Sequence, residues 1–205
     1  MRGYFMIYVD CDDVIAESTS AYIDIIDREF GIKRTFEDIS SFDLKVSFGM
    51  TQEQFNHFFE VVHSREEIMK FKPIEGAIET LTEWMSQGHE VSIITGRITD
   101  AYTSTLDWLA MYKVPYNHFC IVDKYSRPEM DTSIARPLEF LHSIDIDFAV
   151  EDSLAMAKYL ADKLGVPVAL IDRPWNQGNS LNPLITRVSS WSDIKRVFAE
   201  KVNRN

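Results

Sequence analysis

The stretch that decides the fold is a short apolar run ending in acids, Ile7-Tyr8-Val9-Asp10-Cys11-Asp12-Asp13-Val14-Ile15. The apolar residues before Asp10 are typical of a buried parallel strand, which places the acids at its carboxyl end. Ligands bind at that edge of an open α/β sheet. Acids this close together repel one another unless a cation or hydrogen-bond donors offset their charge. The stretch therefore predicts a divalent metal site, the alternative being a strand that runs into an acidic turn.

The rest of the chain alternates between strand-like and helix-like segments. Further apolar runs predict strands at residues 90–95, 118–122, 146–150 and 167–171, and segments with helical periodicity separate most of them. Strands that alternate with helices form parallel sheets. The sequence therefore predicts a Rossmann-like α/β fold with a parallel five-stranded sheet and helices on both faces.

Residues 16–72 interrupt this alternation. Apolar residues recur at helical spacing in their first half, and Thr51 with Gln54 resembles a capping box that opens another helix. We therefore expect a helical insertion after the first strand. The predicted division is an α/β core domain of residues 1–15 and 73–205, with residues 16–72 inserted into it.

The composition argues against several classes of protein. A formal net charge of −11 disfavours binding to a nucleic-acid polymer, which depends on clustered Lys and Arg. The chain has no apolar stretch that approaches the roughly 20 residues of a membrane-spanning helix, so we expect no membrane partner. The two cysteines, Cys11 and Cys120, form no disulfide or metal-binding pattern, which favours reduced thiols in a cytoplasmic protein.

Polar side chains follow the other predicted strands as well. They are Thr95, Gly96 and Arg97 after the second strand, Asp123 and Lys124 after the third, and Glu151 and Asp152 after the fourth. Because the carboxyl ends of parallel strands meet at one edge of a sheet, we expect these residues to lie near the first acids. Each alone has an ordinary interpretation as a cap, a turn or a solvated surface residue. Their coincidence at one edge favours an active site.

The residue types at this edge suit phosphoryl transfer. Carboxylate oxygens are the ligands of Mg²⁺, which is commonly shared with a substrate phosphate. Asp10 is a candidate nucleophile, because Asp carboxylates form aspartyl-phosphate intermediates. Asp12, two residues on, is a candidate general acid and base. Thr95, nearby backbone N–H groups and a cation are candidates to stabilise the transferring phosphoryl oxygens.

Three motifs resemble those of the haloacid-dehalogenase-like (HAD) phosphohydrolases. They are Asp10-Cys11-Asp12-Asp13-Val14, Ile93-Ile94-Thr95-Gly96-Arg97 and Val150-Glu151-Asp152-Ser153, in the order and spacing of that superfamily. The resemblance implies that Asp10 is the nucleophile and a Mg²⁺ ligand. It implies that Asp12 is the general acid and base and binds the metal through its backbone carbonyl oxygen. It further implies that Asp152 binds the metal directly, that Glu151 holds a metal-bound water and that Thr95 binds phosphate.

Within the superfamily, the chain is similar to the 5′(3′)-deoxyribonucleotidase-like branch. The similarity lies in the Asp-Asp-Val form of the first motif, in Phe71-Lys72-Pro73-Ile74-Glu75-Gly76-Ala77 and in Asp172-Arg173-Pro174-Trp175-Asn176. It implies that residues 16–72 form a helical cap over a small phosphorylated metabolite, a nucleoside monophosphate. Phe42 or Phe48 would then stack on the base, and Gly96 and Arg97 would contact the substrate.

The chain departs from the superfamily pattern at two positions. The third motif is normally a lysine at the helix start before the fourth strand, and Arg136-Pro137 stands in that place. Arg keeps the charge but binds phosphate differently from Lys. We therefore expect either Arg136 or Lys124, at an earlier strand end, to neutralise the phosphate. The other departure is Asp13, which stands where the superfamily usually has Gly and is expected to shape the turn.

Several functions remain open at this point. The leading prediction is a Mg²⁺-dependent 5′-nucleotidase acting through an aspartyl-phosphate. The alternatives are a phosphatase of another metabolite such as a sugar phosphate, a phosphomutase, and a catalytically weak nucleotide-sensing protein. A dehalogenase is disfavoured by the acid at Asp12, and a signalling receiver domain by the long insertion. The sequence leaves the oligomeric state open, a homodimer included.

Overall fold

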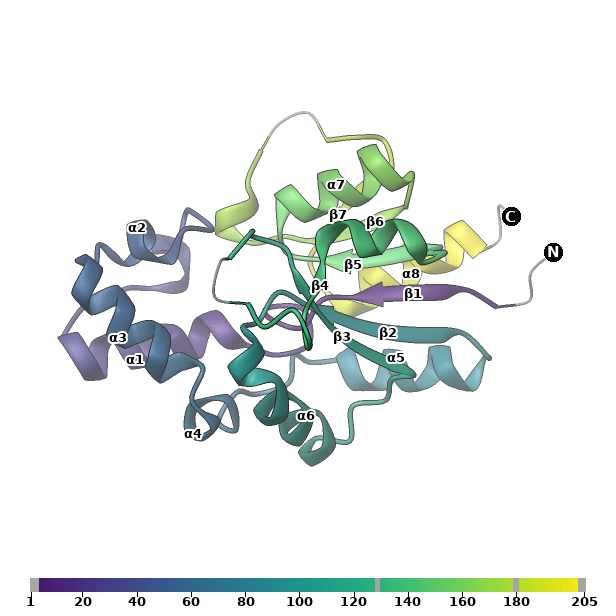
Figure 1. The fold of residues 1–205 in the computed structure, drawn as a ribbon. Coiled ribbons are helices and arrows are strands. Elements are labelled where there is room, and N and C mark those ends of the chain that lie inside the picture. The colour runs from purple at the N-terminus through teal and green to yellow at the C-terminus, as the bar shows by residue number, and fades with distance from the viewer. Residues whose placement is uncertain (1–3, 128–129, 179–180, 203–205) are drawn as a thin grey trace.

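The structure, a computed structural model, describes residues 4–127, 130–178 and 181–202, and these build around one parallel sheet (Figure 1). The sheet has seven strands in the order β4-β3-β2-β1-β5-β6-β7, so that β1 lies in the middle. Every neighbouring pair is parallel. The strands are β1 (Met6–Val9), β2 (Glu90–Thr95), β3 (His118–Asp123), β4 (Arg136–Pro137), β5 (Phe148–Glu151), β6 (Val168–Ile171) and β7 (Ile185–Val188).

The α/β Rossmann-like fold is as the sequence predicts, but the prediction of five strands is wrong. The two additional strands are β4 and β7, at the two edges of the sheet. Strand β4 has two residues, one of them Pro137, and is too short to produce an apolar run. Strand β7 has Thr186 and Arg187 between its two buried residues, so it lacks the continuous apolar pattern of the central strands. Strand β4 leads directly into a 3₁₀ helix, η3 (Leu138–Ser143).

Helices cover both faces of the sheet. Helices α5 (Ala77–Ser86), α6 (Tyr102–Met111) and α8 (Trp191–Val202) pack on one face, in a core that contains Trp84 and Trp108. Helix α7 (Leu154–Leu164) and η3 pack on the other face, where Leu160 and Leu141 are fully buried. The central strands are thus apolar on both sides, and their polar groups are confined to the strand ends.

The helical insertion lies beyond the carboxyl ends of the strands, at the left of Figure 1. Its helices are α1 (Ser18–Phe30), η1 (Phe36–Asp38), α2 (Leu44–Phe48), α3 (Gln52–Val62) and α4 (Arg65–Ile68). They share a small apolar core that includes Ile26, Phe48 and Phe58. The predicted capping box is confirmed, because the side chains of Thr51 and Gln54 each accept a hydrogen bond from the backbone N–H of the other.

The chain enters and leaves the insertion through two paired segments. The N–H of Glu17 donates to the carbonyl oxygen of Lys72 at 2.8 Å, and the N–H of Ile74 donates to that of Ile15 at 2.7 Å. Two buried indoles hold the same segments to the α/β core, Trp108 through the carbonyl oxygen of Phe71 and Trp191 through that of Val14. The insertion is therefore joined to the α/β core by two hydrogen-bonded segments beside the acids that follow β1.

Two short 3₁₀ helices complete the described elements, η2 (Thr99–Ala101) and η4 (Pro174–Asn176). Among the helices of the described residues, none has the length and apolarity needed to cross a bilayer.

Candidate active site

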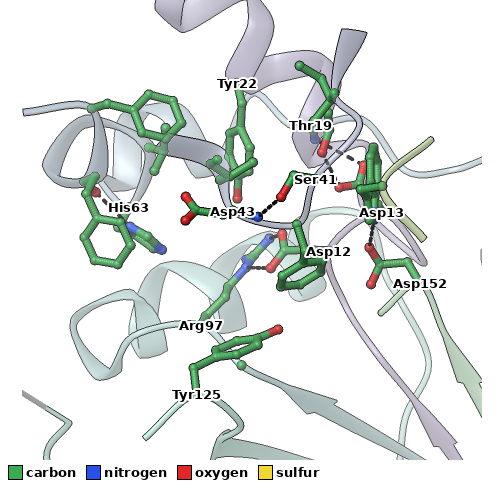
Figure 2. Close-up of a pocket in the computed structure, with 18 of the residues that line it drawn as sticks. Asp12, Asp13, Thr19, Tyr22, Ser41, Asp43, His63, Arg97, Tyr125 and Asp152 are labelled. Atoms are coloured by element: carbon green, nitrogen blue, oxygen red, sulfur yellow. Dashed lines mark hydrogen bonds and ion pairs between the residues drawn. The ribbon is translucent and has the colours of Figure 1, made fainter. Parts of the chain in front are cut away.

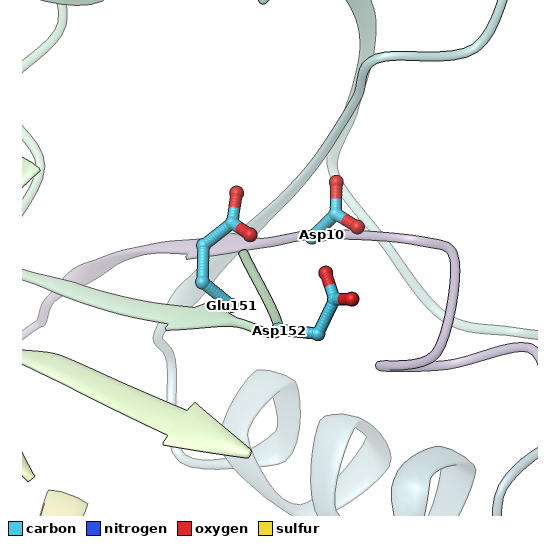
Figure 3. A group of neighbouring side chains, drawn as sticks. All are labelled: Asp10, Glu151 and Asp152. Carbon is cyan, nitrogen blue, oxygen red and sulfur yellow. The ribbon is translucent and has the colours of Figure 1, made fainter. Parts of the chain in front are cut away.

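Three buried carboxylates meet at the carboxyl ends of the two central strands (Figure 3). Asp10 follows β1, and Glu151 and Asp152 end and follow β5, which pairs directly with β1. The N–H of Asp10 donates to the carbonyl oxygen of Val150 at 3.0 Å, which continues the pairing into the site. One carboxylate oxygen from each of the three acids lies within 4.8 Å of the others. The register of two neighbouring strands therefore assembles this acidic cluster.

One buried cation, Lys124, contacts two of these acids. Its ammonium lies 2.6 Å from Oδ1 of Asp10 and 2.9 Å from Oε1 of Glu151. The hydroxyl of Tyr8 donates to the same Glu151 oxygen at 2.6 Å, and the N–H of Ser153 donates to Oε2. Both oxygens of Glu151 thus have donors within the protein.

Gly96 explains how Lys124 reaches the acids. Lys124 follows β3, which is separated from β1 by β2, so its side chain must cross the end of β2. A Cβ atom on Gly96 would lie 2.7 Å from Cε2 of Tyr125 and 3.2 Å from Cδ of Lys124. Only glycine leaves room for these two side chains at this turn.

The charges of the cluster do not balance within the protein. Burial is the largest effect on Asp10 and raises its pKa to about 7, with the Glu151 carboxylate adding to the shift against Lys124. Burial also raises the pKa of Asp152, and the Asp10 charge adds to that shift. Burial disfavours the ammonium form of Lys124, but the two carboxylates outweigh it and raise its pKa. One ammonium does not neutralise three buried carboxylates, so the cluster favours the binding of a further cation.

The carboxylate oxygens of the cluster suit a hard divalent cation as ligands. Oδ2 of Asp10 and Oδ1 of Asp152 accept no hydrogen bond from any residue that the structure describes, whereas the other oxygen of each does. Oxygen ligands of this kind suit Mg²⁺. Asp10 and Asp152 can therefore hold such an ion directly, with Glu151 behind them.

Asp12 stands apart from the acidic cluster and forms an ion pair with Arg97 (Figure 2). Nε and Nη2 of Arg97 donate to the two carboxylate oxygens at 2.9 and 2.7 Å, and Nη1 donates to Oγ1 of Thr105. Burial would raise the pKa of Asp12, but the guanidinium outweighs it and lowers that pKa below its usual value. Arg97 was expected to contact the substrate. In this structure its guanidinium is paired with Asp12 instead.

The side chains of Asp13 and Thr95 accept hydrogen bonds from nearby backbone N–H groups. Asp13 has a φ of 54°, in the left-handed region that favours glycine, and its carboxylate accepts from the N–H and the hydroxyl of Thr19. It thereby shapes the turn and holds the first turn of α1. Thr95 is fully buried at the end of β2, and its hydroxyl accepts from the N–H of Arg97 at 3.2 Å.

A cavity of about 480 Å³ lies next to the acids, between the carboxyl ends of the strands and the insertion (Figure 2). Its floor includes Asp10, Asp12 and Asp152, and its aromatic walls include Phe42 and Phe59. A pocket of this size, mostly apolar with a few convergent polar groups, is typical of a small-molecule site. Its position puts the acidic cluster within reach of a bound ligand.

The sequence left two choices open, Phe42 or Phe48 for the base and Lys124 or Arg136 for the phosphate, and the two members of each pair lie in different places in the structure. Phe42 lines the cavity and its ring lies 5.7 Å from that of Tyr125, whereas Phe48 is fully buried in the core of the insertion and packs against Phe58. The expectation that Phe48 stacks on a substrate is therefore not met. Lys124 contacts Asp10 directly, whereas Arg136 is exposed on the edge strand β4 with its guanidinium over Phe140.

Several residues of the site gave no clear signal in the sequence. Tyr8 lies in an apolar run and resembles an ordinary core residue, and His63 and Arg127 belong to segments without a motif. Trp175, which donates to Asp152, lies in the segment from Asp172 to Asn176 that marks the nucleotidase branch. That segment therefore pointed to Trp175 in advance.

The fold is that of HAD-like hydrolases of known structure. A haloacid-dehalogenase-like hydrolase of Streptococcus pneumoniae superimposes with a TM-score of 0.66 at 15% identity, over 97% of this chain and 100% of that one. A HAD-type hydrolase of Bacillus subtilis, whose structure has bound magnesium, gives a TM-score of 0.61 at 14% identity, over 95% and 98% of the two chains. At these identities the likeness concerns the fold.

The family follows from the sequence comparison. Residues 4–137 match the family model described as "5′ nucleotidase, deoxy (Pyrimidine), cytosolic type C protein", and the chain belongs to this family. A provisionally named nucleotidase of Halalkalibacterium halodurans is 26% identical over 197 residues, covering 96% of this chain and 94% of that protein. Another from Bacillus subtilis is 25% identical and covers 89% and 88%. The protein is a phosphatase of the nucleotidase type.

His63, at the end of α3, is expected to make the free energy of unfolding depend on pH. Its Nδ1 lies 2.7 Å from the carbonyl oxygen of Phe59, which only accepts, so Nδ1 carries the proton. Burial lowers the pKa of His63 to about 4, although the Phe59 carbonyl and the Asp12 charge oppose this and Arg97 and Arg127 assist it.

The unfolded chain therefore takes up a proton at His63 before the folded one does. The free energy of unfolding should fall as pH drops from about 6.5 towards 4, by up to about 2 kcal/mol at pH 5, because one pKa unit corresponds to about 1.4 kcal/mol. Urea unfolding of wild type and His63→Asn at pH 7 and pH 5 measures this loss. A wild-type loss no greater than that of the variant would contradict the neutral state of His63 in the folded protein.

Proposed function

We propose that the protein is a Mg²⁺-dependent 5′-nucleotidase that hydrolyses nucleoside or deoxynucleoside monophosphates through an aspartyl-phosphate at Asp10. The observation that carries this proposal is the cluster of Asp10, Glu151 and Asp152, joined by Lys124, at the floor of an aromatic-walled cavity. Membership of a nucleotidase family supports the reaction class. The free thiols of Cys11 and Cys120 support a cytoplasmic location.

Asp10 is the nucleophile in this proposal. Lys124 holds Oδ1, so the attacking atom is Oδ2, which accepts no hydrogen bond from the described residues. Attack of Oδ2 on phosphorus forms the aspartyl-phosphate and breaks the bond from phosphorus to the substrate oxygen, which leaves with a proton as the nucleoside. Attack of water on the same phosphorus then releases inorganic phosphate and restores the carboxylate.

Asp12 moves the protons of both steps. Arg97 orients its carboxylate and favours the ionised form, which accepts a proton from the attacking water. To act as the acid of the first step, Asp12 must first gain a proton against the charge of Arg97. The ion pair therefore has to loosen when a phosphate enters, which makes Arg97 a residue that adjusts the proton affinity of Asp12.

The remaining residues bind the phosphate and the metal ion. We assign Mg²⁺ to the carboxylates of Asp10 and Asp152 and the backbone carbonyl oxygen of Asp12, with Glu151 acting through a bound water. Bound Mg²⁺ supplies positive charge for the phosphoryl oxygens. Thr95 and the backbone beside it bind the same oxygens from the end of β2.

The insertion provides the part of the site that contacts the nucleoside. We propose that residues 16–72 form a cap domain and that residues 1–15 and 73–205 form the core domain. Phe42 lines the cavity and is 44% exposed, so its ring is available for stacking on a base. An aromatic wall of this kind favours a planar base over a hydrated sugar, which places a nucleotide ahead of a sugar phosphate.

Asp10→Asn tests the proposed reaction. The variant keeps the size of the side chain but removes the nucleophile, so phosphate release from a panel of nucleoside monophosphates and sugar phosphates should fall at least about 1,000-fold. Wild-type activity should be highest on nucleotides and should stop when EDTA removes the metal. Asp24→Asn, on the exposed side of α1, serves as the control and should keep full activity. Turnover by Asp10→Asn or in EDTA would refute the mechanism.

A second pair of variants tests which cation neutralises the phosphate. Lys124→Ala should lower turnover about 100-fold or more, because it removes the ammonium that contacts Asp10. Arg136→Ala should stay within about twofold of wild type, because Arg136 is exposed on β4. Circular dichroism confirms that both variants are folded. The reverse result, an inactive Arg136→Ala and an active Lys124→Ala, would transfer the role to Arg136.

A further inference from the structure

The loop after β6, residues 172–177, lies against the acids that follow β1 and β5. Building on the metal site proposed above, we propose that Trp175 in this loop is a positioning residue for the metal ligand Asp152. Its indole fixes one carboxylate oxygen and leaves the other for the ion, while Phe36 of the insertion holds the indole in place. Metal affinity then depends on the position of the insertion.

The indole contact determines which oxygen of Asp152 is available. Nε1 of Trp175 donates to Oδ2 of Asp152 at 2.8 Å, and Asp152 is only 5% exposed. An indole N–H donates and never accepts, so Oδ2 is the acceptor in this contact. Oδ1 of Asp152 accepts no hydrogen bond from the described residues. Trp175 therefore orients the carboxylate so that Oδ1 is left for a cation.

The backbone of the loop is fixed to the same strand end. Asn176 is buried, and its Nδ2 donates at 2.7 Å to the carbonyl oxygens of both Asp152 and Ile171. Arg187 on β7 in turn donates to the side chain and the carbonyl oxygen of Asn176. These bonds fix the backbone next to Trp175 to the strand end that carries Asp152, so that the orientation of the indole depends on the contacts of its own ring.

The other side of Trp175 contacts the insertion. The ring of Phe36 in η1 lies 5.3 Å from that of Trp175 at 60°, an edge-to-face arrangement. The guanidinium of Arg173 lies over Phe36 at 5.8 Å and donates to the carbonyl oxygen of Asp13 at 2.7 Å. Phe36 thus packs against two residues of this loop, Trp175 and Arg173, which bind the side chain of Asp152 and the backbone of Asp13.

This arrangement links the ion to the insertion through one side chain. If Phe36 helps to hold the indole on Asp152, then a bound ion favours the position of the insertion seen here. By reciprocity, the insertion in this position increases the affinity for the ion.

The experiment measures Mg²⁺ binding to the full-length protein without substrate, by titration calorimetry. Trp175→Phe keeps a ring against Phe36 but loses the N–H, and we expect Mg²⁺ binding to weaken about 10-fold or more, since residues that orient metal ligands have effects of roughly 10–100-fold. Phe36→Leu keeps the indole and should weaken Mg²⁺ binding several-fold. Trp84→Phe, in the core between α5 and the sheet, is the matched control and should bind Mg²⁺ as wild type does.

Two further readouts separate positioning from general damage. In Trp175→Phe the Mg²⁺ concentration for half-maximal activity should rise while kcat at saturating Mg²⁺ is largely retained. In wild type, Mg²⁺ should change the indole fluorescence, and this change should be absent from Trp175→Phe, because Trp175 donates to Asp152 whereas Trp108 and Trp191 donate to the carbonyl oxygens of Phe71 and Val14.

The outcomes distinguish this proposal from the proposed function. Wild-type affinity in Trp175→Phe, with a normal wild-type response to Mg²⁺, would overturn the role of Trp175 and leave the nucleotidase intact. Wild-type affinity in Phe36→Leu would overturn the link to the insertion. A wild-type protein that binds no divalent cation would overturn both.

Discussion

The burial of three carboxylates around one ammonium is the constraint on which the rest of this structure depends. Neighbouring strands β1 and β5 deliver Asp10, Glu151 and Asp152 to a single point, where burial and mutual repulsion raise the pKa of Asp10. Lys124 reaches them past Gly96, whose missing side chain leaves room at the end of β2. The site is therefore built for a further positive charge, and a metal ion beside a phosphate meets that need.

Much of the site was predictable because parallel strands bring their carboxyl ends to one edge. Short apolar runs followed by acids identify Asp10, Glu151 and Asp152 without any knowledge of strand order. The edge strands were not predictable in the same way. Strands β4 and β7 lie at the margins of the sheet and lack the continuous apolar pattern that burial on both faces produces.

The sequence left open those side chains whose partners lie far away along the chain. Lys124 and Arg136 are both cations near strand ends, and only the three-dimensional path over Gly96 brings one of them to Asp10. Phe42 and Phe48 lie in a segment without sustained periodicity, so no pattern distinguishes a residue lining the cavity from one in the insertion core. The ion pair of Arg97 with Asp12 spans 85 residues and carried no local signal.

The insertion is connected to the acidic cluster, and together they enclose the cavity. The insertion rises from two hydrogen-bonded segments next to Asp12 and Asp13, and its aromatic residues close the side of the cavity opposite the acids. Apolar walls exclude water and strengthen the electrostatic interactions on the cavity floor. The Arg97 ion pair, the indole on Asp152 and the insertion thus all act on the two carboxylate-bearing loops that follow β1 and β5.

The central claim is that Asp10 carries the phosphoryl group, and chemical trapping tests it most directly. Wild-type protein is quenched during turnover with a nucleoside monophosphate and Mg²⁺, treated with borohydride to reduce an acyl phosphate to an alcohol, and digested for peptide mass analysis. We expect homoserine in place of Asp10, formed only when substrate and Mg²⁺ are both present. Reduction at a different acid, or an unmodified Asp10 in protein that is turning over, would contradict it.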